Sequence, residues 1–206
     1  MNPATDQERF ALRGRRFIRW TRGLMLVGGG LAVCYVALTL LNGRLYQDAA
    51  NKSLDRQANA TEQPVSSLSR ATKNEGDVLG RIEIPRLGLK VAILEGTSAQ
   101  TLRLGAGHIK GTALPGEPGN IGIAGHRDTW FRAVRDIRDQ DEIQIQTRSG
   151  LSRYEVDWMQ IVEPGDGGVL TASPGSAVTL VTCFPFHYIG AAPERYIVHA
   201  RLAPPK

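Results

Sequence analysis

Cysteine is scarce in this 206-residue chain, which contains only Cys34 and Cys183. Cys34 falls inside an uncharged apolar run, so the two thiols cannot readily pair and the chain is not a disulfide scaffold. The histidines outside the motifs described below lack metal-ligand spacing with another His or Cys. No internal repeat is apparent. If the C-terminal part is exported, Cys183 is a lone thiol that is a liability unless it is buried or used.

Positive charge is concentrated at the start of the chain, although the formal net charge is only +5. A basic chain could bind nucleic acid, but this cluster directly precedes an apolar run, so a membrane surface explains it better. The length leaves room for one ordinary domain plus an appendage. The clustered arginines are Arg9, Arg13, Arg15, Arg16, Arg19 and Arg22.

The run Leu24–Leu41 contains no charge and is close to the ~20 residues that a helix needs to cross a bilayer. The upstream arginines predict a cytoplasmic N-terminus by the positive-inside bias. A cleaved signal peptide is the alternative, but its apolar stretch is usually about 7–15 residues. Gln47–Ala50 is also a poor cleavage site, and Arg15-Arg16 fits a twin-arginine signal only loosely. We therefore predict an uncleaved anchor.

Composition divides the chain into four segments. We predict a cytoplasmic basic segment at 1–23, a transmembrane signal-anchor helix at 24–42, an extracytoplasmic linker at 43–76 and a folded domain at 77–204. The linker is polar and lacks a sustained apolar stripe. It is therefore predicted to be a tether that holds the domain off the membrane.

Short alternating runs separated by Gly and Pro predict that the folded domain is mainly β. A short helix is predicted at Ser98–Leu102, capped by Thr97 or Ser98. Arg148-Ser149-Gly150 predicts a hairpin turn. Many short strands with little helix favour a closed or nearly closed β-barrel. The predicted strands are Leu79–Ile84, Leu89–Leu94, Asn120–Ala124, Glu142–Thr147, Tyr154–Val162, Ala177–Cys183 and Arg195–Leu202.

Three of these runs carry reactive side chains at their ends. Cys183 ends one run, His126 follows another by two residues, and Arg195 opens the last. A thiolate attacks an amide carbonyl well, an imidazole can protonate the leaving amine, and a guanidinium can stabilise the oxyanion. Arg195 would also favour the thiolate through its positive potential. Together the three side chains offer a nucleophile, an acid/base and an oxyanion stabiliser.

Side-chain alternation assigns these residues to faces of the predicted sheet. Ile121 and Ile123 point toward the core, which puts His126 on the other face if the strand runs regularly that far. Gly122 and Ala124 share that face and are small enough to leave space for an extended substrate. In the last run, Tyr196, Val198, Ala200 and Leu202 suit the core, whereas the opposite face carries Arg195, Ile197, His199 and Arg201.

Thr-Leu-Val-Thr-Cys at 179–183 and Arg-Tyr-Ile-Val at 195–198, together with Gly-His-Arg at 125–127, resemble motifs of the sortases. Sortases are membrane-anchored cysteine transpeptidases that attach proteins to bacterial surfaces. The resemblance covers roughly residues 77–204. Thr-Cys-Phe-Pro-Phe at 182–186 and Ala-Pro-Glu-Arg at 192–195 are most similar to the class D enzymes.

This resemblance implies an eight-stranded β-barrel that serves as the catalytic domain. It also implies cleavage of a Leu-Pro-x-Thr-like sorting signal through an acyl-thioester on Cys183, followed by transfer to an amine of the cell surface or of a pilin. Cys183, His126 and Arg195 would be catalytic, and Ala124, Thr182 and Phe184 would contact substrate. Membrane lipid would surround the anchor, and no cofactor and no nucleic acid is implied.

Other functions stay open at this point. A hydrolytic cysteine peptidase needs only water in place of the amine, and a non-catalytic surface binding module would not need all three residues together. L,D-transpeptidases carry their histidine close to the cysteine in sequence, whereas His126 and Cys183 are far apart. Taken singly, each residue also has a structural explanation: a buried cysteine, a turn histidine and a solvated arginine.

The remaining polar side chains receive structural interpretations. His108 could border the substrate groove, His187 follows Cys183 in a short loop, and His199 lies on the outer face of the last strand. Some sortases bind calcium through acidic residues, but a solvated turn better explains the acidic cluster of this chain. That cluster consists of Asp139, Asp141 and Glu142.

Overall fold

The computed structural model describes residues 20–38, 41, 45, 47–49, 52, 74–171, 175–188 and 190–204. The chain divides into two compact units, residues 1–44 and residues 45–206. In the first unit, the helix Trp20–Leu38 is long and apolar enough to cross a membrane. It overlaps the predicted run Leu24–Leu41 over residues 24–38. Residues 1–19 of the predicted basic segment lie outside the described residues.

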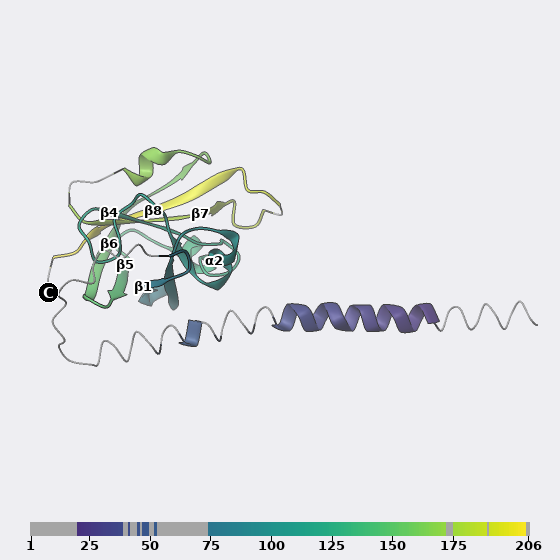
Figure 1. Ribbon diagram of the computed structural model, residues 1–206. Coiled ribbons are helices and arrows are strands. Elements are labelled where there is room, and N and C mark those ends of the chain that lie inside the picture. The colour runs from purple at the N-terminus through teal and green to yellow at the C-terminus, as the bar shows by residue number, and fades with distance from the viewer. Residues whose placement is uncertain are drawn as a thin grey trace, which may run out of the picture. The chain divides into compact units, whose positions relative to one another are not determined.

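The second unit contains a closed β-barrel whose strand order is β1-β2-β3-β4-β7-β8-β6-β5 (Figure 1). The β2–β3 and β4–β7 pairs are parallel, and the other neighbours are antiparallel. Closure leaves no free sheet edge. The strands are β1 Val78–Ile84, β2 Leu89–Glu95, β3 Ala106–His108, β4 Asn120–Ala124, β5 Glu142–Thr147, β6 Gly150–Val162, β7 Ala177–Phe184 and β8 Glu194–Leu202.

Helical segments within the barrel unit are short. They are η1 Pro85–Leu87, α2 Ala99–Leu104, η2 Arg132–Asp136 and η3 Gly167–Leu170. The Ser98 hydroxyl caps α2 by accepting a hydrogen bond from the Thr101 N–H at 3.2 Å, as expected for an N-cap serine. The predicted helix and cap are confirmed, and the helix continues two residues beyond Leu102.

All seven predicted strands are present, and the eight-stranded barrel is confirmed. The eighth strand, β3, was not predicted because its three residues Ala-Gly-His are too few to show an alternating pattern. The hairpin around Arg148–Gly150 is also confirmed. Its second strand begins at Gly150 rather than at Tyr154, because Gly150–Ser152 pair with the end of β5.

Alternation explains most of the core, which contains Ile121, Ile123, Val198 and Ala200. Leu202, predicted to face the core, is instead 48% exposed, because it is the last residue of β8 and passes the end of the barrel. On the outer face of β8, Ile197 and His199 are also buried. There the Trp158 ring stacks on the His199 ring, with 4.8 Å between their centroids. The outer face of β8 is therefore partly covered by a side chain of the neighbouring strand β6.

Residues of η3 and its flank cover the beginning of β4 and β7. Asn120 Nδ2 donates to the carbonyl of Thr171 at 3.3 Å, and the Thr179 hydroxyl donates to Asn120 Oδ1 at 2.8 Å. A Cβ atom placed on Gly122 would lie 3.1 Å from Leu170 Cδ2. The prediction that Gly122 leaves space for substrate is therefore wrong, because Leu170 fills that space. Only the ends of β4 and β7 stay accessible.

Three residues of the predicted linker, Gln47, Glu75 and Gly76, are hydrogen-bonded to the barrel. The Gln47 side chain is 6% exposed and accepts a hydrogen bond from the Ala92 N–H at 2.8 Å, and its Nε2 donates to the Leu104 carbonyl. Ala92 precedes the point where β2 begins to pair with β3, at Ile93 and Ala106. The Gln47 amide thus binds backbone groups just before that pairing begins. The linker is more than a tether at this position.

The acidic cluster is not a solvated turn at Asp141. The Asp141 side chain is 7% exposed, and it accepts hydrogen bonds from the Arg86 guanidinium and, at 2.7 Å, from the Arg138 N–H. The bond with Arg86 lowers the pKa of Asp141 below its ordinary value. This pair ties η1 to the segment before β5. Asp139, by contrast, is exposed as predicted.

We expect Asp141→Asn to lower the free energy of unfolding by about 1 kcal/mol at pH 7, because the hydrogen bonds from Arg86 lose their charged acceptor while the exposed Arg86 side chain stays screened by solvent. The folded-state pKa of Asp141 is depressed, so its contribution is complete above the unfolded pKa of about 3.9. It is lost as the pH falls through the folded pKa. Thermal unfolding across pH 2–8 checks this, with Asp139→Asn as the control. An equal effect of both variants would contradict it.

Candidate active site

The end of β4 is fastened to β7 by two hydrogen bonds. The parallel register pairs Ala124 with Val181. The next residue, Gly125, donates its N–H to the Val181 carbonyl at 3.1 Å, and the Thr182 hydroxyl donates to the Gly125 carbonyl at 2.7 Å. His126 and Cys183 each lie one residue beyond this connection. The backbone pairing therefore brings the predicted imidazole and thiol to the same end of the barrel.

The pairing of β7 with β8 adds the guanidinium. Cys183 lies directly opposite Arg195 in the antiparallel register. Directly opposed residues on one face of a sheet have Cβ atoms roughly 4.5–5.5 Å apart. Both residues face outward, because Leu180 and Val198 belong to the core and side chains alternate along each strand. The three predicted residues thus lie at the ends of three neighbouring strands, β4, β7 and β8 (Figure 1).

The backbone before His126 requires glycine. A Cβ atom on Gly125 would lie 2.5 Å from the ring of Phe131, which is fully buried. The Phe131 N–H donates to the His126 carbonyl at 3.0 Å and closes the turn. This close approach of ring and backbone fixes the direction in which the chain leaves β4. The glycine of the Gly-His-Arg segment therefore serves to position the histidine.

The Arg195 guanidinium is held by its own loop. Its Nη1 donates to the carbonyls of Ala192 at 3.2 Å and Glu194 at 2.9 Å. Arginine carries five N–H donors in a fixed plane, so further donors are left for a developing negative oxygen. Cys183 is a free, half-buried thiol, and His126 is also half-buried. This arrangement can support nucleophilic attack, proton transfer and oxyanion stabilisation at one place.

Comparison with known proteins agrees with this geometry. The family model for the sortase domain matches residues 82–203. The chain belongs to the sortase family. It is 35% identical over 144 residues to Sortase D of Bacillus subtilis (strain 168), covering 69% of this chain and 72% of that protein. The predicted similarity to class D is therefore confirmed, and members of this family are cysteine transpeptidases.

Solved sortase structures share the fold. A Sortase D5 transpeptidase from Clostridium perfringens superimposes with a TM-score of 0.62 and 28% identity, over 78% of this chain and 98% of that one. Sortase C from the same organism, solved with the C-terminal cell wall sorting motif, gives a TM-score of 0.60 and 29% identity. That match covers 75% of this chain and 85% of the other.

Aromatic side chains line the surface next to the Cys183 thiol. Phe184 packs against the rings of Tyr196 and Phe186, at centroid distances of 6.3 and 6.0 Å. Burial raises the pKa of Tyr196 above its ordinary value. Phe184 also borders a surface cavity of about 620 Å³, together with Pro185, Phe186 and His187. The cavity lies beside the predicted substrate contact Phe184.

The other two predicted substrate contacts differ from Phe184 in their surroundings. Ala124 is half-buried at the end of β4. The Thr182 side chain is only 3% exposed, and its hydroxyl is engaged by the Gly125 carbonyl. This bond assigns Thr182 a positioning role for the His126 segment. Direct contact of either residue with a substrate stays a prediction.

Sequence reasoning missed Arg127, which connects the two loops of the site. Its Nη2 donates to the carbonyls of Tyr188 at 2.7 Å and Gly190 at 3.1 Å, and the guanidinium lies 6.0 Å from the Tyr188 ring centroid. Arg127 follows His126 directly, whereas Tyr188 follows Cys183 by five residues. The side chain therefore holds the β7–β8 loop to the histidine loop. Only its adjacency to His126 could have indicated this role from sequence.

The remaining histidines have structural positions. His108, which could have bordered the groove, has a structural position instead, because it is 2% exposed and its Nδ1 lies 2.9 Å from Glu95 Oε2. His199 is bonded to Asp157 at 2.6 Å on the outer face of β8. His187 is exposed beside the cavity near Phe184. Among the described residues, no group of three His, Cys, Asp or Glu side chains could hold a metal ion.

We expect Arg127→Ala to loosen the β7–β8 loop without unfolding the barrel. Each lost bond has a charged donor, so local opening should increase by on the order of tenfold. Amide hydrogen exchange of Phe186–Tyr188 and Gly190–Ala192 measures this, with the exposed Arg103→Ala on α2 as the control. Unchanged exchange in this loop would show that Arg127 does not hold it.

Proposed function

We propose that this sortase cleaves a Leu-Pro-x-Thr-like sorting signal, forms an acyl-thioester on Cys183, and transfers the acyl group to an amine of the cell surface or of a pilin. The main support is the register, which opposes Cys183 to Arg195 and pairs Ala124, two residues before His126, with Val181, two residues before Cys183. The family membership adds support, and a related sortase C has been solved with a sorting motif.

The first half of the proposed reaction uses all three side chains. The Cys183 thiolate attacks the carbonyl carbon of the scissile amide, and Arg195 donates hydrogen bonds to the resulting oxyanion. His126 gives a proton to the leaving nitrogen as the C–N bond breaks. The products of this step are a thioester and the released C-terminal peptide as a free amine.

The second half reverses the same steps with a new amine. The acceptor nitrogen attacks the thioester carbonyl and loses a proton to His126, and the C–S bond breaks to release the Cys183 thiolate. Water in place of the amine would give a hydrolytic peptidase on the same site. We favour transfer over hydrolysis because the family consists of transpeptidases. The free, half-buried Cys183 thiol argues against a non-catalytic binding module with a fully buried cysteine.

The proposed location is the cell membrane. The apolar helix Trp20–Leu38 would be the single anchor, with the preceding arginines in the cytoplasm and the barrel outside. The proposed partners are then secreted proteins that carry a sorting signal, an amine acceptor of the envelope or a pilin, and the lipid around the anchor. An exported barrel would meet its protein substrates as they leave the membrane.

Replacement of the nucleophile and of the acid/base should remove activity. We expect Cys183→Ala to abolish turnover of a sorting-signal peptide. His126→Ala should reduce it by on the order of 10²–10⁴, because the leaving amine then departs without a proton. Chromatographic quantification of both peptide products is the measurement, and Cys34→Ala is the control for loss of a thiol. Near-wild-type turnover in either site variant would overturn the assignment.

Arg195→Ala should lower turnover by on the order of 10²–10³ with little change in thermal midpoint, because an oxyanion donor is lost. Arg195→Lys keeps the charge without the planar fork and should recover only part of this loss. Arg201→Ala, on the same strand and face but six residues away, is the matched control. A fall in thermal midpoint that tracks the lost activity would mean that Arg195 is structural.

A further inference from the structure

A second, smaller cavity lies between the two loops of the site. It has a volume of about 250 Å³, and Cys183, His126 and Arg195 are not among the residues that line it. Two of its residues directly follow His126, and two others lie three and four residues after Cys183. The cavity is lined by Arg127, Asp128, Arg132, Arg135, Phe186 and His187.

Positive charge exceeds negative charge in this lining. Three arginines face a single carboxylate, that of Asp128. Arg127 bonds only to neutral carbonyls, and its Nη1 is buried without a partner among the described residues. Arg135 is paired with Asp136 at 3.2 Å, outside the lining. An anionic ligand would therefore be stabilised in this cavity.

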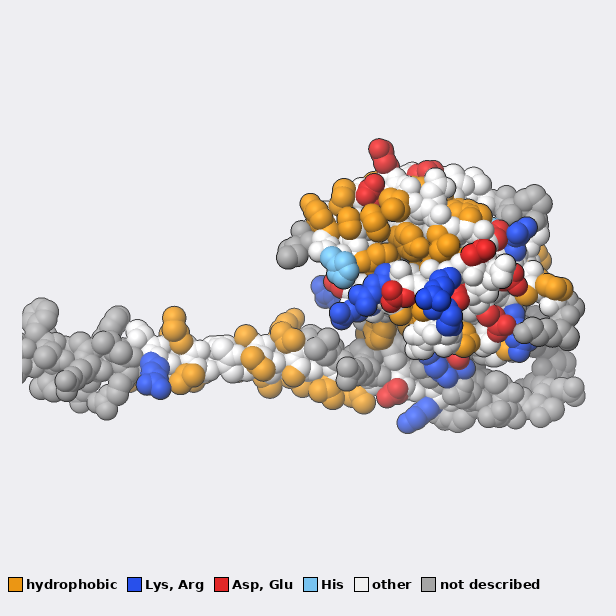
Figure 2. Space-filling view, turned by 180° about the vertical axis from the view of Figure 1, so that it is seen from behind, with side chains coloured by type: hydrophobic (Ala, Val, Ile, Leu, Met, Phe, Trp, Pro, Cys, Tyr) orange, Lys and Arg blue, Asp and Glu red, His pale blue; other side chains and the backbone are white. Residues whose placement is uncertain are grey.

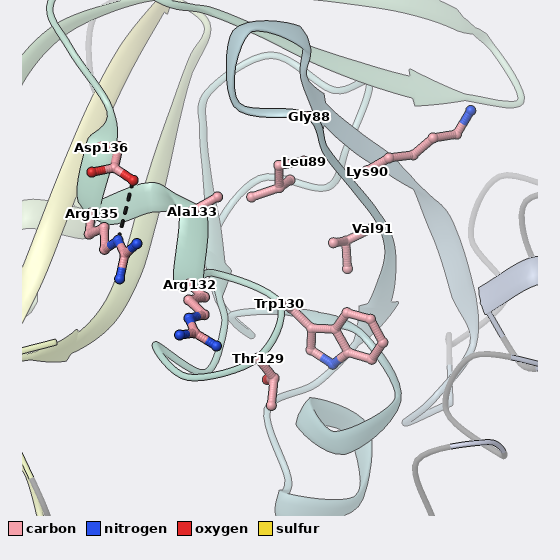
Figure 3. A pocket seen from close by; sticks show the side chains of 10 residues that line it. All are labelled: Gly88, Leu89, Lys90, Val91, Thr129, Trp130, Arg132, Ala133, Arg135 and Asp136. Carbon is pink, nitrogen blue, oxygen red and sulfur yellow. Dashed lines mark hydrogen bonds and ion pairs between the residues drawn. The ribbon is translucent and has the colours of Figure 1, made fainter. Parts of the chain in front are cut away.

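Two of the three arginines, Arg132 and Arg135, belong to η2. Figure 3 shows a different cavity, which Arg132 and Arg135 line together with Trp130, and the Arg135–Asp136 pair is the bond drawn there. The described residues offer Arg132 no ion pair within 4.0 Å. Figure 2 shows basic side chains that adjoin a histidine and an apolar band on one face of the barrel, with acidic side chains among them.

The position of this cavity points to the acceptor, on the basis of the function proposed above. His126 protonates the leaving amine and must take the proton from the incoming one, so both nitrogens occupy the same place beside His126. The groups attached to the incoming nitrogen extend from there. Arg127 and Asp128 continue the chain directly from His126 into the cavity wall. An acceptor with an anionic group a few bonds from its amine can therefore reach the arginines.

We propose that the cavity lined by Arg127, Arg132 and Arg135 binds a carboxylate carried by the acceptor amine, so that the enzyme selects amino-acid-like acceptors over neutral amines. The Arg132 guanidinium is the main recognition group, because Arg127 already donates to a carbonyl of the β7–β8 loop and Arg135 is already paired with Asp136. In the transfer step the acceptor nitrogen bonds to the thioester carbon, its proton goes to His126, and the C–S bond breaks. The carboxylate itself takes no part in the bond changes.

The test compares two acceptors of matched size, diglycine and glycylglycinamide, which differ only in the terminal carboxylate. The full-length enzyme is incubated with a sorting-signal peptide, and mass spectrometry quantifies the transfer product relative to the hydrolysis product for each acceptor. We expect the wild type to prefer diglycine by on the order of tenfold, as for one charge-assisted hydrogen bond. The preference should weaken at high salt.

Substitutions of Arg132 test whether the preference for diglycine arises in this cavity. Arg132→Gln should reduce the ratio between the two acceptors toward one, and Arg132→Glu should reverse it, whereas Arg148→Glu in the distant β5–β6 turn should leave it unchanged. Because the readout is a ratio within one enzyme preparation, a partial loss of folded protein lowers the product from both acceptors equally and leaves the ratio unchanged. The thermal midpoint of each variant verifies folding.

Two negative results are distinguishable. Peptide cleavage without a preference for diglycine, or a preference that Arg132→Glu leaves intact, would overturn the carboxylate site and leave the proposed function standing. Absence of both transfer and hydrolysis with peptides that carry Leu-Pro-x-Thr-like signals would overturn the proposed function itself, and the carboxylate site with it.

Discussion

The parallel pairing of β4 with β7 is the interaction on which the site depends. Gly125 binds β7 through its N–H and its carbonyl, to Val181 and Thr182 respectively. Residues 57 positions apart in the chain are thereby brought into one register. Cys183 already lies opposite Arg195 in the β7–β8 pair. The connection through Gly125 adds His126, so that all three side chains lie at the same end of the barrel. A slip of one residue would turn the side chains of β7 to the other face of the sheet.

Packing around this connection confines the chemistry to one end of the barrel. Leu170 covers Gly122 on the outer face, and Phe131 packs against Gly125 beneath His126. Arg127 then ties the loop after Cys183 to the loop after β4. Other side chains cover the outer face of β4 along its first part, so that this face is accessible to solvent only where β4 and β7 end. The accessible surface there offers an apolar side near Phe184 and a basic side near Arg132.

Much of the fold was predictable because it rests on local patterns. Alternation identified the long strands, and the ends of three runs identified the candidate site. Properties set by contacts between distant segments were not predictable. β3 has three residues and exists only because β2 and β4 flank it. Neither the burial of Asp141 by Arg86 nor that of His108 beside Glu95 leaves a trace in local sequence. The same holds for Leu170 over Gly122 and for the loop contacts of Arg127.

We infer that the register of β4, β7 and β8 makes Cys183 the residue that carries the acyl group. The most direct measurement is mass spectrometry of the intact protein, followed by peptide mapping, after brief reaction with a sorting-signal peptide. We expect a mass increase equal to the acyl fragment, located on Cys183 and removed by hydroxylamine. An adduct on another residue, or peptide cleavage with no adduct on Cys183 at any reaction time, would contradict it.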